Sequence, residues 1–323
     1  MMQEAIKNFP RQFLYEPQIE NVERLRQYAR FVVIGMGGSH LAADILKTWD
    51  PALPLIIHSD YGLPPLPEED LQSHLVIVSS YSGNTEETID GFMEAGKRGY
   101  ARAAVSVGGK LLALAKQEGV PYIKMLDTGI QPRSALGLTA RALLKLMGRA
   151  EALSEMSKLE QLLDIATSEE EGKQLAERLR GKIPVIYASG RNAAIASNWK
   201  IKFNETAKIP AFYNVFPELN HNEMTGFDVT ESTKDLSDKF YFIFLRDSGD
   251  HPRALKRMET TERLFRDRNL PVEIRELFGI NTFHKIFSSL LLADWAAYWT
   301  ATLYGVESEQ VPMVEELKRR LAS

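Results

Sequence analysis

The chain has 323 residues, of which 44% are hydrophobic and 25% charged, and its formal net charge at pH 7 is −4. This composition is typical of a soluble globular protein, and the length favours two domains over one core. There is no basic block, no uninterrupted apolar segment of about 18 residues and no cysteine, so we expect no nucleic acid or membrane partner, while disulfides, thiolate metal sites and cysteine nucleophiles are excluded.

Short apolar runs alternate with helical patterns in the first half of the chain. The runs fit buried parallel strands and cover residues 31–34, 55–58, 75–78, 103–107 and 122–125. Helices are predicted near residues 39–48, 85–98 and 110–118. This alternation predicts an α/β domain with a doubly wound parallel sheet, which we assign to residues 1–150.

A glycine-rich turn, Gly35-Met36-Gly37-Gly38-Ser39, follows the first predicted strand. It matches part of a dinucleotide-binding fingerprint, but that pattern requires glycine at position 40, where this chain has histidine. The favoured interpretation is a loop that lets a sugar approach the backbone closely. A tight strand–helix turn with no ligand is the alternative.

The most informative stretch is residues 79–88, SSYSGNTEET, directly after the third predicted strand. Hydroxyls and a glycine at the start of a helix, where backbone N–H groups are unpaired, form a cradle for an anion. The stretch has no lysine and lacks the spacing of a nucleotide P-loop, so the cradle suits one phosphate monoester. An N-capped helix is the alternative, but a cap needs one hydroxyl, whereas Ser80, Ser82 and Thr85 cluster here.

The two turns should meet at one site, because ligands of such sheets bind beyond the carboxyl ends of the strands. Arg133, just before another predicted helix, could hold a sugar hydroxyl or an enediolate oxygen. A surface charge is an equally good interpretation of Arg133.

The second half of the chain repeats the strand–helix alternation. Between about residues 139 and 180 we predict two or three connecting helices. Strands are then predicted at 184–188, 211–216, 240–245 and 272–277, and helices near 190–208, 218–225, 251–268, 281–303 and 310–321. Residues 185–192 correspond to residues 32–39, since both read as strand, glycine turn and helix. We therefore predict a second domain at residues 151–323.

Glu205 and His221 form a usable acid–base pair in this second half. On a regular helix, Glu205 shares a face with Lys202 and Lys208. A carboxylate can move a carbon-bound proton while an imidazole handles oxygen protons. Taken singly, Glu205 is better explained as a solvated helical carboxylate and His221 as a polar residue at a helix N-terminus. Lys318 lies in a charged run that suggests no role by itself, and the other histidines show no metal-ligand spacing.

Taken together, the motifs resemble the bifunctional phosphoglucose/phosphomannose isomerases of the sugar isomerase (SIS) superfamily. The resemblance spans nearly the whole chain and rests on Gly35–Ser39, Ser80–Thr88, Pro132-Arg133, Asn204-Glu205 and Pro217–Glu223. The serine-rich run is typical of SIS domains, and the last two motifs narrow the match to this branch. The resemblance implies two SIS domains, each a doubly wound parallel sheet flanked by helices, in a homodimer with the active site near the subunit interface.

The resemblance also implies roles for individual residues. Glu205 would be the base that shuttles a proton between C1 and C2 through a cis-enediol, and His221, reaching the site from the partner subunit, would assist ring opening. Arg133 would steady the enediolate, and Lys318 would reach the active site from the terminal helix. No metal or organic cofactor is implied. The residues implied to bind substrate, with their hydroxyls on the 6-phosphate, are Gly37, Gly38, Ser39, Ser80, Ser82 and Thr85.

Two stretches depart from the family pattern. His40 stands where glycine is usual, and Glu307–Gln310 replaces the Asp-Pro-Thr-Pro of many members. The second departure lies near the family's sugar pocket, so it affects the expected activity on mannose 6-phosphate more than that on glucose 6-phosphate.

The expected function is the interconversion of glucose 6-phosphate, and of mannose 6-phosphate, with fructose 6-phosphate in glycolysis or gluconeogenesis. The mixed polar start of the chain has no signal-peptide core, so the expected location is cytoplasmic. Two alternatives stay open: another SIS chemistry such as an amino-sugar phosphate isomerase, and a non-catalytic sugar-phosphate sensor.

Overall fold

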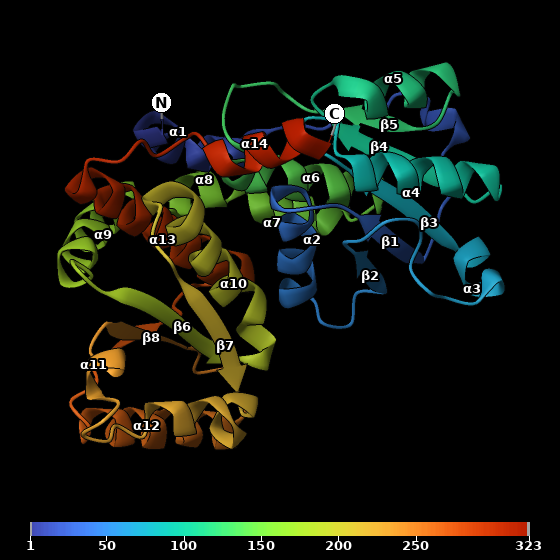
Figure 1. Ribbon diagram of the computed structural model, residues 1–323. Coiled ribbons are helices and arrows are strands. Elements are labelled where there is room, and N and C mark those ends of the chain that lie inside the picture. The colour runs from blue at the N-terminus through green and yellow to red at the C-terminus, as the bar shows by residue number, and fades with distance from the viewer. Residues whose placement is uncertain (1, 322–323) are drawn as a thin grey trace. The chain divides into compact units, whose positions relative to one another are not determined.

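The computed structural model describes residues 2–321, which divide into two compact units (Figure 1). Residues 7–163 form the first unit, and residues 2–6 together with 164–321 form the second. The sequence pattern places the boundary after residue 150, whereas the first unit extends to residue 163. Residues 151–163 belong to the first unit because α7 (Ala150–Ser157) and α8 (Leu159–Leu162) pack against the 3-10 helix η1 (Phe9–Leu14).

The first unit contains a five-stranded parallel sheet in the order β2-β1-β3-β4-β5. The chain passes from β1 to β2 and then returns across β1 to β3, so the strand order reverses between β1 and β3. Every strand predicted for this half is present, with ends within one residue of the prediction. The strands are β1 (Arg30–Ile34), β2 (Leu55–His58), β3 (His74–Ser79), β4 (Arg102–Ser106) and β5 (Tyr122–Lys124).

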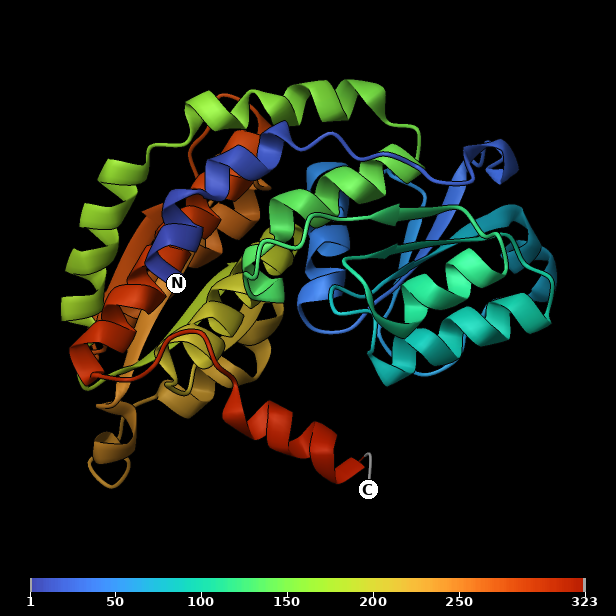
Figure 2. The same cartoon turned by 90° about the horizontal axis from the view of Figure 1, so that it is seen from above.

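Helices cover both faces of this sheet (Figure 2). On one face, α4 (Glu86–Lys97) and α5 (Gly109–Gln117) bury alternate strand residues such as Ile34 and Val78. On the other face, α2 (Gly38–Trp49) packs with α6 (Leu136–Leu146). The predicted doubly wound architecture is confirmed. The short elements of this unit were not predicted: η1, η2 (Val22–Arg24), α3 (Glu68–Ser73) and η3 (Pro132–Ser134).

The second unit has a four-stranded parallel sheet in the order β7-β6-β8-β9. Here too the first strand lies inside the sheet and the order reverses beside it, between β6 and β8. The predicted correspondence between residues 32–39 and 185–192 is therefore confirmed as a shared topology. The strands are β6 (Ile183–Ser189), β7 (Phe212–Phe216), β8 (Phe240–Arg246) and β9 (Val272–Glu276).

Two layers of helices flank the second sheet. On one side α9 (Ile165–Arg178) packs along α13 (Thr282–Tyr304), which also contacts α10 (Ala193–Lys202). On the other side α12 (Pro252–Arg266) covers an aromatic core around Tyr187 and Phe242. The remaining elements are α1 (Met2–Lys7), η4 (Gly190–Asn192), η5 (Phe203–Ala207), η6 (Glu218–His221), η7 (Glu223–Phe227), α11 (Lys234–Ser237) and α14 (Pro312–Leu321).

Three helix predictions need correction. The region from 136 to 178 holds four helices, α6 to α9, rather than two or three, because Gly148 adopts φ +68° after α6 and Asp164 accepts a hydrogen bond from Thr167 N to start α9 afresh. Residues 218–227 form two 3-10 helices instead of one α-helix. The helix expected to run to Lys208 stops being α-helical after Lys202. Across residues 2–321, no helix combines the length and apolarity that crossing a membrane requires.

Candidate functional site

In the first unit, the loops after β1 and β3 meet where the strand order reverses. Ser39, in the first turn of α2, is buried there and bonds the other loop twice. Its carbonyl accepts a hydrogen bond from Ser79 Oγ at 3.1 Å, and its hydroxyl accepts one from the N–H of Tyr81 at 2.9 Å. The two turns therefore converge at one edge of the sheet, as predicted.

The three clustered hydroxyls of the second loop differ in exposure. Ser80 is fully buried, and its Oγ lies 2.9 Å from Thr85 Oγ1 and accepts a bond from Gly83 N at 3.1 Å. Thr85 is the N-cap residue of α4, yet in the structure of this loop its hydroxyl is directed to Ser80 and makes no side-chain cap. Ser82 is exposed and accepts from Asn84 N at 3.3 Å. Ser80 therefore stabilises the loop through internal hydrogen bonds, while the side chain of Ser82 lies at the surface.

Arg133 lies beside the glycine turn. Gly37 has φ +49° and ψ −127°, a conformation that favours glycine, and it leads directly into α2. A Cβ on Gly38 would lie 2.8 Å from the carbonyl carbon of Pro132 and 2.9 Å from Arg133 N, so only glycine lets α2 approach η3 this closely. Arg133 itself is 2% exposed. Gln12 secures the same turn by donating to Ser134 O at 2.7 Å.

In the second unit, Glu205 lies on a π-helical turn, η5, that continues α10. Lys208 ends this turn in the left-handed conformation (φ +57°) and donates through Nζ to the carbonyl oxygen of Glu205. Asn204 Nδ2 donates to Ile209 O at 3.0 Å and so closes the chain back on the turn. The predicted regular helix with Glu205 and Lys208 on one face is therefore wrong. Single π-turns inside helices are frequent at functional sites.

A buried ion pair anchors this turn to α13. Lys202 Nζ lies 2.6 Å from Asp294 Oδ1, and the two residues are 1% and 5% exposed. Because Lys202 precedes Glu205 by three residues, the pair fixes the end of α10 from which the π-turn starts. His221, at the end of η6, is exposed. Lys318 of α14 is exposed as well, with its Nζ 2.8 Å from Glu315 Oε1, as its charged surroundings indicate.

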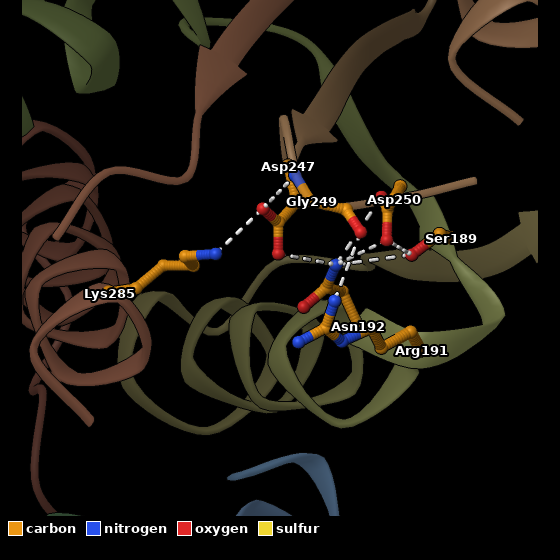
Figure 3. Close-up of polar contacts among 7 residues, drawn as sticks. All are labelled: Ser189, Arg191, Asn192, Asp247, Gly249, Asp250 and Lys285. Carbon is orange, nitrogen blue, oxygen red and sulfur yellow. Dashed lines mark hydrogen bonds and ion pairs between the residues drawn. The ribbon is translucent and has the colours of Figure 1, made fainter. Parts of the chain in front are cut away.

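A polar cluster outside the predicted site residues lies where the strand order of the second sheet reverses (Figure 3). Asp250 Oδ1 accepts from Ser189 Oγ at 2.7 Å and from Asn192 Nδ2 at 3.2 Å. Asp247 Oδ1 accepts from Lys285 Nζ at 2.7 Å and from Gly249 N at 2.9 Å. The sequence Asp-Ser-Gly-Asp, one residue after the strand predicted at 240–245, is the signal that indicates this turn.

The pKa values of the two carboxyls in this cluster are shifted in opposite directions. Burial opposes ionisation of Asp247, but the bonds from Lys285 and Gly249 N outweigh it, and its pKa is lowered. Burial raises the pKa of Asp250, which Ser189 and Asn192 only partly offset and the charge of Asp247 reinforces. Carboxylates at this edge oppose the binding of a phosphate, so the two units differ in chemistry at corresponding places. Within residues 2–321, no group of three or more His, Cys, Asp or Glu side chains is placed to hold a metal ion.

Comparison with known proteins decides the family. Residues 168–321 match the family model described as the bacterial phospho-glucose isomerase C-terminal SIS domain. The bifunctional phosphoglucose/phosphomannose isomerase of Aquifex aeolicus is 32% identical over 321 residues, 98% of this chain and 97% of the relative. The chain belongs to the bifunctional phosphoglucose/phosphomannose isomerase family. The member of this family from Caldicellulosiruptor bescii is 33% identical and is aligned over 99% of each chain.

The family's fold extends to more distant structures. Tagatose-6-phosphate ketose/aldose isomerase from Escherichia coli superposes with a TM-score of 0.66 at 16% identity, covering 94% of this chain and 93% of that one. At this identity the likeness concerns the fold alone. The α/β class with two SIS domains, predicted from the motifs, is confirmed.

Both departures from the pattern of the phosphoglucose/phosphomannose isomerase family make local bonds. His40 Nδ1 lies 2.6 Å from Asp44 Oδ2 one helical turn further along α2. The Glu307 carboxylate accepts from the N–H groups of Glu309 at 2.7 Å and Gln310 at 2.6 Å, which shapes the turn before α14. Each substituted side chain therefore stabilises the element on which it lies.

Proposed function

We propose that this chain is an aldose–ketose isomerase that interconverts glucose 6-phosphate, and mannose 6-phosphate, with fructose 6-phosphate. The relatives at 32% and 33% identity carry both activities in their names. The observation that carries the proposal is the joining of the glycine turn and the hydroxyl loop through Ser39, in the same unit as the buried Arg133. Hydroxyls, glycine backbone and an arginine are the groups that recognise a phosphorylated sugar.

In this proposal the 6-phosphate is bound by the hydroxyl loop. Ser82 and Thr85 donate to its oxygens, while Ser80 holds the loop and Ser39 contributes its proton. A serine hydroxyl that accepts from the N–H of Tyr81 can still donate, since it has one proton and two lone pairs. The exposed backbone of Gly37 would contact the sugar, and the close approach at Gly38 holds this turn against the segment that carries Arg133.

The reaction is a proton transfer between two neighbouring carbons. His221 exchanges protons with the ring oxygen and the anomeric hydroxyl, which opens the hexose ring. Glu205 then removes the proton from C2 of the aldose, and the electron pair forms a cis-enediolate. After a proton passes from the hydroxyl on C2 to the oxygen on C1, the same carboxylate returns its proton to C1 and leaves the ketone at C2. Arg133 stabilises the negative charge that develops on the enediolate oxygen, and Lys318 stabilises the same charge. We propose that the enzyme acts as a homodimer in the cytoplasm, in glycolysis or gluconeogenesis.

Proton NMR in D2O tests this function. The purified protein, incubated with fructose 6-phosphate, should produce glucose 6-phosphate deuterated at C2, and mannose 6-phosphate if the specificity is dual. Glu205→Gln should abolish deuterium incorporation while sugar-phosphate binding persists. If the natural chain binds the sugar phosphate without exchange or turnover, the sensor alternative replaces the proposal. Normal activity in Glu205→Gln would refute the assignment of the base.

A further inference from the structure

We propose that Glu223 is a positioning residue that fixes the segment carrying His221, a role that rests on the proposed isomerase function. One oxygen of the Glu223 carboxylate accepts a hydrogen bond from Tyr187 Oη, and the other accepts one from Asn214 Nδ2. Tyr187 and Asn214 lie opposite each other in the register of β6 and β7. A single carboxylate therefore ties the start of η7 to two neighbouring strands of the sheet.

The residues around His221 are held on both sides. On the N-terminal side, Leu219 is fully buried and Asn220 Nδ2 donates to Thr261 Oγ1 of α12 at 2.8 Å. On the C-terminal side, Asn222 Oδ1 accepts from Glu223 N at 2.6 Å, and Asn222 Nδ2 donates to Glu218 Oε1 at 2.8 Å. His221 is exposed between these anchors. Such an arrangement holds the backbone still and leaves the imidazole open to exchange protons with a ligand.

The direction of each hydrogen bond to Glu223 is fixed. Tyr187 is completely buried, with its ring 5.4 Å from that of Phe244 and 5.9 Å from that of Phe216. Burial, together with the bond to Glu223, raises the pKa of Tyr187, so its hydroxyl remains a donor. Asn214 Oδ1 accepts from Val215 N at 2.8 Å, which turns its Nδ2 group toward Glu223. The position therefore requires a side chain with two acceptors.

This requirement sets up a test by exchange of donors and acceptors. Glu223→Gln replaces one acceptor with an amide N–H2 group. If that group faces Asn214, two N–H2 groups oppose each other, and if it faces Tyr187, the buried hydroxyl proton of Tyr187 has no acceptor, so one donor loses its acceptor in either orientation. Asn214→Asp restores both bonds in the double variant, because the new carboxylate accepts from the new amide and still accepts from Val215 N, while the amide oxygen accepts from Tyr187. Asn214→Asp alone sets two carboxylates against each other. Only the double variant recovers both bonds.

The kinetic prediction separates positioning from binding. Glu223→Gln and Tyr187→Phe should each lower kcat about 10- to 100-fold with KM nearly unchanged, since misplacement of a catalytic group by about 1 Å has effects of this size. The double variant Glu223→Gln/Asn214→Asp should recover most of that loss. The matched control is Tyr241→Phe, which removes a comparable bond, from Tyr241 Oη to Glu273 Oε2 at 2.7 Å, between β8 and β9. It should keep kcat within about twofold of the natural chain.

A second readout is independent of turnover. The ring signals of His221 in 1H–15N spectra should broaden or shift in Glu223→Gln and Tyr187→Phe, and return in the double variant. If the natural chain isomerises no hexose phosphate, the proposed function fails, while these spectra still test the positioning. Natural-type kcat and His221 signals in both single variants would overturn the inference. Should Glu223→Gln not fold, Tyr187→Phe, which keeps the ring in its aromatic cluster, carries the test alone.

Discussion

The hydroxyl of Ser39 accepts a hydrogen bond from the backbone N–H of Tyr81, and this 2.9 Å contact joins the loops that follow β1 and β3. Both residues are buried, so the N–H of Tyr81 loses its acceptor in a site with little exposure to water when the hydroxyl is removed. The Ser39 side chain is also a candidate phosphate ligand. Replacing it should therefore change both the stability of the protein and its affinity for the sugar phosphate.

We predict that Ser39→Ala lowers the free energy of unfolding by about 1–3 kcal/mol, because it leaves the N–H of Tyr81 buried without its acceptor. It should also raise KM for the sugar phosphate. Urea denaturation and steady-state kinetics measure the two effects. Ser82→Ala is the control: it removes an exposed hydroxyl and should raise KM while changing stability by less than about 0.5 kcal/mol. An unchanged unfolding free energy in Ser39→Ala would contradict the linking role.

Gly38→Ala should push α2 away from η3, because the added methyl group would lie within 3 Å of the Pro132–Arg133 backbone. The expected cost is about 1–3 kcal/mol of stability, as for other overpacked sites. Arg133 would be displaced at the same time, and kcat should fall. Gly190→Ala is the matched control at the corresponding turn of the second unit, where the methyl group would meet only Phe216 O at 3.9 Å. Equal stability of the two variants would show that the close approach is unimportant.

Asp247 and Asp250 should make the free energy of unfolding depend on pH in opposite directions. The pKa of Asp247 is lowered by folding, so its contribution is present above the unfolded-state value of about 3.9 and is lost as pH falls through the folded value. The pKa of Asp250 is raised, so its contribution is present at low pH and is lost as pH rises through the folded value. Urea denaturation from pH 3 to pH 7 measures both.

Accordingly, Asp247→Asn should be least stable relative to the natural chain at pH 7, and the difference should shrink below about pH 4. Asp250→Asn should gain stability relative to the natural chain as pH rises over the same range. Parallel curves for the two variants would mean that the cluster titrates as a single unit.

Removing one partner of the Lys202–Asp294 pair should strongly destabilise the protein. Lys202→Met leaves the buried carboxylate of Asp294 without its ammonium partner, at a cost of about 3–5 kcal/mol. The double variant Lys202→Met/Asp294→Leu should recover much of that stability, because apolar side chains can replace a buried pair. Thermal denaturation of the three proteins tests this. Single and double variants of equal stability would show that the pair contributes no coupling.

The sheets were predictable because buried parallel strands leave continuous apolar runs such as Leu75–Val78 and Phe240–Leu245. The convergence of Ser39 with the hydroxyl loop followed from topology, since neighbouring parallel strands end at one edge. The π-turn at Glu205 could not be predicted, because α-helical periodicity does not reveal a locally widened turn. Glu223 lay within a motif that was noted, but its partner Tyr187 is 36 positions away in the chain, and no local pattern connects the two.

The π-turn at Phe203–Ala207 has a consequence for chain length as well as chemistry. Each residue of an α-helix turns the chain by about 100°, so one residue more or fewer in this turn would swing the Glu205 carboxylate to another side of the helix. Deleting one residue beside Glu205 would restore α-helical winding and misdirect the carboxylate, although Glu205 itself remained in the chain. Insertions and deletions should therefore be tolerated much less between Lys202 and Lys208 than most substitutions.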